Sequence, residues 1–433
     1  MNGVPTRIRG PLRAGKRRFL GLSNGRVYTW VVFRATRDKA ENQRPSRRST
    51  NPFEVVLAPP GGGNLGDQAL VQSFLTNSKV SITVIVRSAS NFDLTGFSPE
   101  SVSLVEMPDL LYSSGRRNIR DFRRFTSMVS GASSFSVIGA DIIDGAYNET
   151  ASINRIRAVR LARRSGVPAR ILGFSWNDRP KTNVVRELRL ASESGGRLCA
   201  RDPASFRRMQ ELGLDNLHMT ADMVFALRPA SGADAEALLR LDTLRAKVAG
   251  CKYVVLNASG MVGRSLPQTS AYIATVNLLL NLGYSVVLLP HVARASGDDV
   301  AECRKVYEGA QAAGVHFVDG LLTPDGVKQL VETAEFVLSG RMHLSVIALS
   351  VGVPSAVVAT QGKVEGLLAL FGIEHLSIAP DRFIEDRMKK AVMNCHKDRD
   401  RLVSEIESHL PEVRVLAEKN FANLEDAELV VSK

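Results

Sequence analysis

One stretch of the sequence decides the fold: SGRMHLSVIALS at residues 339–350. The apolar residues 336–338 just before it predict a buried parallel strand, and residues 342–350 predict a helix that a following glycine and proline end. Arg341 and His343 therefore lie where a strand passes into a helix. Open α/β sheets bind their ligands at such a point, and the start of a helix adds unpaired backbone N–H groups and a partial positive charge. The stretch thus predicts an anion-binding site.

The same alternation of strand and helix extends along the chain in two series. The first series has apolar runs near residues 54–58, 80–86, 135–138, 169–173 and 197–200, and the second has runs at 253–257, 285–289, 315–318, 336–338 and 355–359. Continuous apolar runs separated by helical patterns indicate parallel sheets that are covered on both faces. We therefore predict an α/β protein with two doubly wound domains.

The length of the chain supports the same division, because 433 residues are too many for one ordinary core. We expect a basic N-terminal extension at residues 1–50 and a first Rossmann-like domain, with a glycine-rich loop, at 51–228. A second Rossmann-like domain with the Arg-Met-His motif follows at 246–380, and a helical segment at 381–433 ends the chain.

The net charge of +12 lies almost wholly in the first 50 residues, which hold 13 Lys/Arg and 2 Asp/Glu. The body is near neutral, so nucleic acid is not expected as a partner. Scattered arginines are typical of a solvated tail, which can also contact an anionic membrane surface. Residues 26–34 predict a strand, paired as a hairpin with 18–22. This run is too short to span a bilayer and no signal peptide is recognisable, so we expect a cytoplasmic protein, with peripheral membrane contact left open.

The four cysteines, at positions 199, 251, 303 and 395, lie far apart and form no C-x-x-C pair. They are typical of unpaired thiols in a reducing compartment, and no metal site is expected.

A glycine-rich loop at residues 61–67, GGGNLGD, follows the first predicted strand. Its glycines allow the backbone to approach a ligand closely, and Asp67 is predicted to cap the next helix. The loop matches neither G-x-G-x-x-G nor a P-loop. Taken alone, it is more typical of a tight turn with a helix cap than of a ligand-binding loop.

A third motif is the segment Arg201-Asp202-Pro203. Asp202 as N-cap and Pro203 at the first helical position predict a helix start, which leaves Arg201 at the end of a strand and directed toward the crevice. The alternative is that Arg201 only pairs with a nearby carboxylate.

The order of these motifs resembles that of the polysaccharide pyruvyl transferase family, over about residues 54–375. The matching segments are 61–67, 139–141, 200–205, 222–225, 340–343 and 352–354, together with Lys363. The resemblance implies a glycosyltransferase-B-like fold, with two Rossmann-like domains that face each other across a cleft. It also implies transfer of the pyruvyl group of phosphoenolpyruvate to hydroxyls of a sugar, in a polysaccharide or its lipid-linked precursor, to form a pyruvate ketal.

The resemblance also assigns roles to residues. Arg201, Arg341 and the Met342 backbone would hold the phosphate and carboxylate of phosphoenolpyruvate, His343 would be the general acid, and Lys363 matches a functionally important lysine. Two arginines at a helix start suit a ligand with two neighbouring anionic groups. A histidine can supply a proton to the enol carbon near neutral pH.

Further residues complete the predicted substrate site: Gly63, Asn64, Asp67 and Asp141. Asp67, Asp141 and Asp222 are the candidates for holding or deprotonating the acceptor hydroxyl, and the sequence does not rank them. His291 follows another strand; one interpretation is that it lines the cleft, and the favoured one is a plain loop histidine. One departure is Ala140, which stands where the family has a second glycine.

Apart from phosphoenolpyruvate as donor substrate, we expect no cofactor, and the oligomeric state stays open. A glycosyltransferase that uses a nucleotide sugar would share the fold. The Arg341-Met342-His343 motif with Lys363 argues against it, and Glu365 is the only nearby candidate for binding a ribose. A non-catalytic binding protein is a third class, against which the presence of Arg201 and His343 argues.

Overall fold

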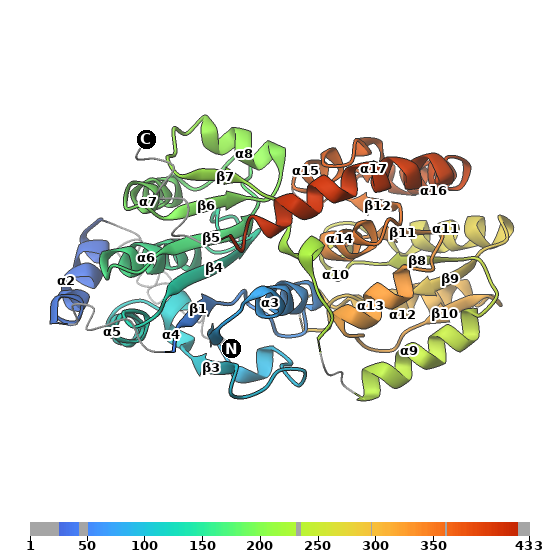
Figure 1. Ribbon diagram of the computed structural model, residues 1–433. Helices are drawn as coiled ribbons and strands as arrows, with labels where there is room; N and C mark the ends of the chain where they lie inside the picture. The colour runs from blue at the N-terminus through green and yellow to red at the C-terminus, as the bar shows by residue number, and fades with distance from the viewer. Residues whose placement is uncertain (1–25, 43–50, 231–234, 296, 360–361, 423–433) are drawn as a thin grey trace, which may run out of the picture.

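The computed structural model describes residues 26–42, 51–230, 235–295, 297–359 and 362–422, which form two α/β domains (Figure 1). The N-terminal domain holds a seven-stranded parallel sheet in the order β3-β2-β1-β4-β5-β6-β7. Its strands are β1 Phe53–Leu57, β2 Ser81–Val86, β3 Val102–Glu106, β4 Ser134–Ala140, β5 Ala169–Phe174, β6 Arg197–Ala200 and β7 Leu217–Met219. Its helices are α2 Arg26–Asn42, α3 Leu65–Asn77, α4 Pro108–Tyr112, α5 Arg116–Val129, α6 Glu149–Arg164, α7 Thr182–Glu193 and α8 Pro203–Gln210, with short 3-10 turns η1 Ala89–Asn91 and η2 Met223–Ala226.

The C-terminal domain holds a six-stranded parallel sheet in the order β10-β9-β8-β11-β12-β13. Its strands are β8 Tyr253–Asn257, β9 Ser285–Leu288, β10 Val315–Phe317, β11 Phe336–Ser339, β12 Ser355–Val358 and β13 Ser377–Ile378. Its helices are α9 Ala235–Val248, α10 Gly260–Gly263, α11 Thr269–Asn281, α12 Asp299–Ala310, α13 Pro324–Val331, α14 Met342–Ser350, α15 Val364–Ala369, α16 Ile384–Lys397 and α17 Arg399–Glu418, with the 3-10 turn η3 Glu374–Leu376.

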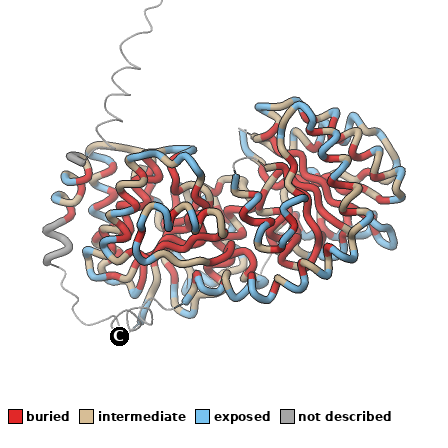
Figure 2. The backbone as a smooth tube through the Cα atoms, turned by 90° about the horizontal axis from the view of Figure 1, so that it is seen from above, coloured by how far each residue is buried: buried red, intermediate tan, exposed pale blue. Residues whose placement is uncertain are grey.

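The strands are the most buried part of both domains, as Figure 2 shows in red. All seven residues of β4 and all six of β5 are buried, because helices cover both faces of a parallel sheet. This burial explains why the strands are continuous apolar runs in the sequence. The predicted fold class, two doubly wound domains, is confirmed.

Each sheet reverses its strand order beside its first strand, between β1 and β4 in one domain and between β8 and β11 in the other. The carboxyl ends of strands at such a reversal border a crevice where α/β proteins bind ligands. Both reversals therefore point to the region between the domains.

The last helix joins the two domains, since α17 runs from the C-terminal domain back to the N-terminal one (Figure 1). The side chain of Asn420, just beyond it, donates a hydrogen bond to Ala221 O and accepts one from Gly173 N, both at 2.9 Å. The residues after α16 thus belong partly to the N-terminal domain.

The prediction of a strand at residues 26–34 is wrong, because this segment lies within helix α2. Its inward residues recur at helical spacing: Thr29, Val32 and Thr36 are all buried. The helix packs against α5, and Thr29 Oγ1 donates a hydrogen bond to Glu187 at 2.9 Å. The predicted hairpin partner, 18–22, lies outside the described residues. None of the described helices is both long and apolar enough to cross a membrane.

Candidate active site

The predicted site residues come from the carboxyl ends of strands in both sheets. Asp67 lies in the helix after β1, Asp141 follows β4, Arg201 follows β6, Asp222 follows β7, Arg341 and His343 follow β11, and Lys363 follows β12. Contacts between these residues connect the two domains.

His343 lies in the first turn of α14 and contacts the N-terminal domain on two sides. Its Nε2 is 3.5 Å from Asp222 Oδ2, which is an ion-pair distance, too long for a good hydrogen bond. The ring also rests on Gly66 in α3, where an added Cβ would lie 2.5 Å from Nδ1. Its side chain is 14% exposed. Gly66 was not among the predicted site residues, although it lies inside the glycine-rich motif.

Asp222 connects His343 to Arg201. Arg201 Nη1 donates to Asp222 Oδ2 at 2.8 Å, and both side chains are buried. Burial alone would raise the pKa of Asp222, but His343 and Arg201 outweigh it and lower the pKa to about 2. Arg201 thus pairs with a carboxylate, and its other guanidinium nitrogens face Ser175 and Met342. Its Nη2 also lies 3.8 Å from the Met342 sulfur, at the start of α14.

A second ion pair between the domains joins Lys363 Nζ to Asp141 Oδ2. Burial would raise the pKa of Asp141, but Lys363, then Arg201, hold it well below its usual range. Tyr147, which sequence reasoning missed, donates its hydroxyl to Asp141 Oδ2 at 3.1 Å. Ala140, just before Asp141, adopts a left-handed φ of 46°, a conformation that glycine takes at lower cost.

Arg341 is held by Asp299, which lies in the first turn of α12. Its Nε and Nη2 donate to the two carboxylate oxygens at 2.7–3.2 Å, and Nη2 also donates to Gly297 O at 2.9 Å. Asp299 is fully buried and also accepts from Gly260 N at 2.9 Å. This pair fixes the orientation of Arg341 beside the start of α14. Asp299 was not singled out from the sequence.

The glycine-rich loop contacts the backbone of the other domain. Gly63 O accepts a hydrogen bond from Ala293 N at 2.8 Å, and Leu65 N donates to His291 O at 3.1 Å. A Cβ on Gly63 would lie 1.9 Å from Ala293 O, and the residue has a φ of +74°. The contact between the domains therefore requires a glycine at position 63, because any side chain there would clash with the backbone of Ala293.

The prediction that Asp67 caps the helix is wrong. Helix α3 begins at Leu65, because Asn64 accepts a hydrogen bond from Gly66 N at 3.1 Å and forms the cap. Asp67 lies within the first turn, 6% exposed, and its carboxylate accepts from Gly61 N at 2.9 Å. Burial raises the pKa of Asp67 to about 6, against the opposing effect of His343. Asp67 therefore titrates close to neutral pH.

The start of α14 carries no side-chain cap, since the side chain of its N-cap residue, Arg341, turns to Asp299. The backbone N–H groups of the first turn are therefore available to an anion, in a helix of nine residues. Within the described parts of the chain, no group of three or more His, Cys, Asp or Glu is arranged to hold a metal ion.

Solved structures share this two-domain architecture. The UDP-GlcNAc 2-epimerase of Neisseria meningitidis bound to UDP-GlcNAc superposes with a TM-score of 0.58 at 11% identity, covering 89% of this chain and all of that one. A glycosyltransferase from Rickettsia africae gives a TM-score of 0.53 at 8% identity and covers 86% of this chain and all of that one. At such low identity the likeness shows the fold alone, which is glycosyltransferase-B-like.

The fold makes the chain a two-domain protein of the glycosyltransferase-B type, and the family match makes it a transferase. The family model of polysaccharide pyruvyl transferases matches residues 64–362, most of the chain, and the chain belongs to this family. No curated protein matches it.

Proposed function

We propose that the protein transfers the pyruvyl group of phosphoenolpyruvate to two hydroxyls of a sugar, forming a pyruvate ketal and releasing phosphate. The observation that carries this proposal is the uncapped start of α14, flanked by Arg201, Arg341 and His343. A ligand with a phosphate and a carboxylate close together suits backbone N–H groups and two oriented guanidinium groups. The matched family points to the same reaction class.

In the proposed reaction, protonated His343 donates its proton to the methylene carbon of phosphoenolpyruvate. The neighbouring carbon becomes an oxocarbenium-like centre, which the first sugar hydroxyl attacks while it loses its proton to a base. Phosphate then leaves with the electron pair of its bond to that carbon, the second hydroxyl attacks the same carbon to complete the ketal, and the proton of this hydroxyl passes to the departing phosphate. The anionic groups of the donor are held by Arg201, Arg341, Lys363 and the Met342 backbone.

Asp67 is the best candidate for the base. A general base works best when its pKa lies near the working pH, and burial raises the pKa of Asp67 to about 6. Nearby cations keep the pKa values of Asp141 and Asp222 low, so these carboxylates accept a proton less readily. We assign them to holding cations and the acceptor in place.

We further propose that the acceptor is a polysaccharide unit or its lipid-linked precursor, and that the enzyme works in the cytoplasm with peripheral contact to the membrane. Two features support membrane contact. The basic extension carries nearly all of the net charge, and α5 adds five exposed arginines, at positions 116, 117, 120, 123 and 124. Clustered arginines are attracted to anionic lipid surfaces.

The donor is tested by thermal unfolding with phosphoenolpyruvate or UDP-GlcNAc. A ligand that binds only the folded protein stabilises it, by about 2.7 kcal/mol at 100 times its Kd. We expect phosphoenolpyruvate to raise the melting temperature and UDP-GlcNAc to leave it unchanged. A shift with UDP-GlcNAc alone would replace the proposal with a nucleotide-sugar glycosyltransferase.

A further inference from the structure

His291 lies in the loop after β9, at the carboxyl end of the second sheet and against the glycine-rich loop. Its backbone is fully engaged: its N–H donates to Asp299 Oδ2 at 3.3 Å, and its carbonyl accepts from Leu65 N at 3.1 Å. The residue is 1% exposed. Its position is therefore fixed by both domains.

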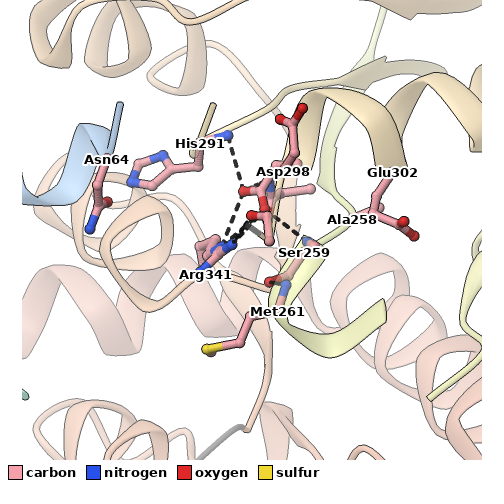
Figure 3. A network of polar contacts seen from close by, with 12 residues as sticks. Asn64, Ala258, Ser259, Met261, His291, Asp298, Glu302 and Arg341 are labelled. Atoms are coloured by element: carbon pink, nitrogen blue, oxygen red, sulfur yellow. Dashed lines mark hydrogen bonds and ion pairs between the residues drawn. The ribbon is translucent and has the colours of Figure 1, made fainter. Parts of the chain in front are cut away.

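The imidazole of His291, in contrast, has no partner. Neither Nδ1 nor Nε2 makes a hydrogen bond within the described part of the chain. In Figure 3 only the backbone nitrogen of His291 is joined by a dashed line, while the ring lies on the side of Asn64. A buried polar group without a partner costs free energy that a leucine of similar volume would not. This cost is unexplained if the ring serves packing alone.

The surroundings keep this ring neutral and place it near the site. Burial, then His343 and Arg341, lower the pKa of His291 well below its ordinary value. A neutral imidazole has one N–H donor and one acceptor nitrogen. It can therefore bind an anion through a hydrogen bond without bringing a further charge beside Arg341.

We propose that His291 is a further substrate-binding residue, whose ring donates a hydrogen bond to an anionic oxygen of the donor bound at the start of α14. The unpaired ring then gains its partner when the donor enters. The inference rests on the proposed function, because it takes phosphoenolpyruvate as that donor.

The test compares His291→Leu and His291→Gln with a control variant, His316→Leu, in β10. Phosphoenolpyruvate affinity is measured by calorimetry and stability by urea unfolding without ligand. We expect His291→Leu to bind about tenfold more weakly, the loss of one hydrogen bond of about average strength, while His291→Gln, which keeps a donor, stays within about threefold. The Michaelis constant should rise in parallel, with kcat nearly unchanged, because a contact made equally before and during reaction affects binding. His316→Leu should leave the affinity unchanged.

The ligand-free stability distinguishes this role from packing. Without donor, His291→Leu should have the same urea midpoint as wild type or a higher one, because it removes an unpaired polar group. A lower midpoint together with wild-type affinity would overturn the inference and make His291 a packing residue. Failure of the wild-type protein to bind phosphoenolpyruvate would instead refute the proposed function.

Discussion

Three aspartates from the same domain have different environments, and this separates their roles. Asp141 pairs with Lys363, and Asp222 pairs with Arg201, so both remain ionised. Asp67 is bonded to the backbone at Gly61 and is almost fully buried. Asp67 thus titrates near pH 6, whereas Asp141 and Asp222 stay ionised well below this pH. Such a difference in pKa lets neighbouring carboxyl groups take distinct acid and base roles.

The raised pKa of Asp67 predicts a dependence of stability on pH. The pKa of Asp67 is about 6 in the folded protein and 3.8 in the unfolded chain. Between pH 3.8 and pH 6 the folded protein therefore binds this proton more tightly than the unfolded chain does, and the free energy of unfolding falls as the pH rises. Above about pH 6 the folded protein carries the full destabilisation from the buried Asp67 carboxylate, on the order of 1–3 kcal/mol. We therefore expect Asp67→Asn, which keeps an acceptor for Gly61 N, to be more stable than wild type at pH 7.5 but not at pH 4.

Urea unfolding at the two pH values measures this effect. Asp242→Asn, at an exposed position in α9, is the matched control and should show no such difference. An Asp67→Asn variant equally destabilised at both pH values would mean that the hydrogen-bond geometry matters more than the charge.

At the scale of elements, the first turns of α3 and α14 meet through Gly66 and His343. A methyl group on Gly66 would displace the imidazole, since it would lie 2.5–2.9 Å from two ring atoms and the Cβ of His343. Alanine would favour helix α3 by up to about 1 kcal/mol. The fold should therefore survive while His343, the proposed general acid, moves.

We expect Gly66→Ala to lower turnover in the same direction as His343→Gln, whose loss should be roughly 10²–10⁴-fold. Phosphoenolpyruvate affinity should change little in both, because proton donation acts in the transition state. Gly326→Ala in α13, where the nearest atom would be 3.2 Å away, is the control. Steady-state kinetics measures the turnover and calorimetry measures the phosphoenolpyruvate affinity. Wild-type turnover in Gly66→Ala would show that the observed position of His343 against Gly66 is not needed for the reaction.

The sequence predicted those elements whose signals are local. Helix α14 has the predicted limits, and Asp202 caps α8 through Ser205 N at 2.7 Å, as its Asp-Pro signal indicated. The sequence did not predict elements whose structure depends on contacts with residues far along the chain. Residues 26–34 resemble a strand, but α5 provides the surface on which they form a helix. Short edge strands such as β3, β7 and β13 also gave no apolar run strong enough to be predicted.

The site shows the same division. The residues at strand ends were predictable because parallel strands deliver their carboxyl ends to one edge. Asp299, which orients Arg341, was not predictable, since the pair spans two helices of the C-terminal domain. The role of Gly66 could not be predicted either, because it depends on a contact with His343 of the other domain, and a local sequence pattern carries no information about that contact.

At the scale of the whole molecule, the basic extension consists of residues 1–25 and a part that contains helix α2. We expect deletion of these two parts to have different effects on stability. Within α2, Val32 is fully buried, and Thr29 accepts hydrogen bonds from the buried Arg157 at 2.6 and 3.1 Å. Removing α2 would leave Arg157 without this partner and expose apolar surface on α5 and α6. Residues 1–25 lie outside the described residues.

This division predicts different results for two truncations. A chain that starts at residue 26 should unfold at the wild-type urea midpoint and keep its turnover on a water-soluble acceptor. A chain that starts at residue 51 should lose roughly 3–5 kcal/mol, because it uncovers a packed core and a buried charge together. Sedimentation with vesicles that contain anionic lipid then tests the membrane contact on the stable truncation. Reduced binding assigns the contact to residues 1–25, and unchanged binding assigns it to the basic residues that remain, at positions 26–50 and in α5. If the chain that starts at residue 51 is as stable as wild type, α2 does not contribute to the fold.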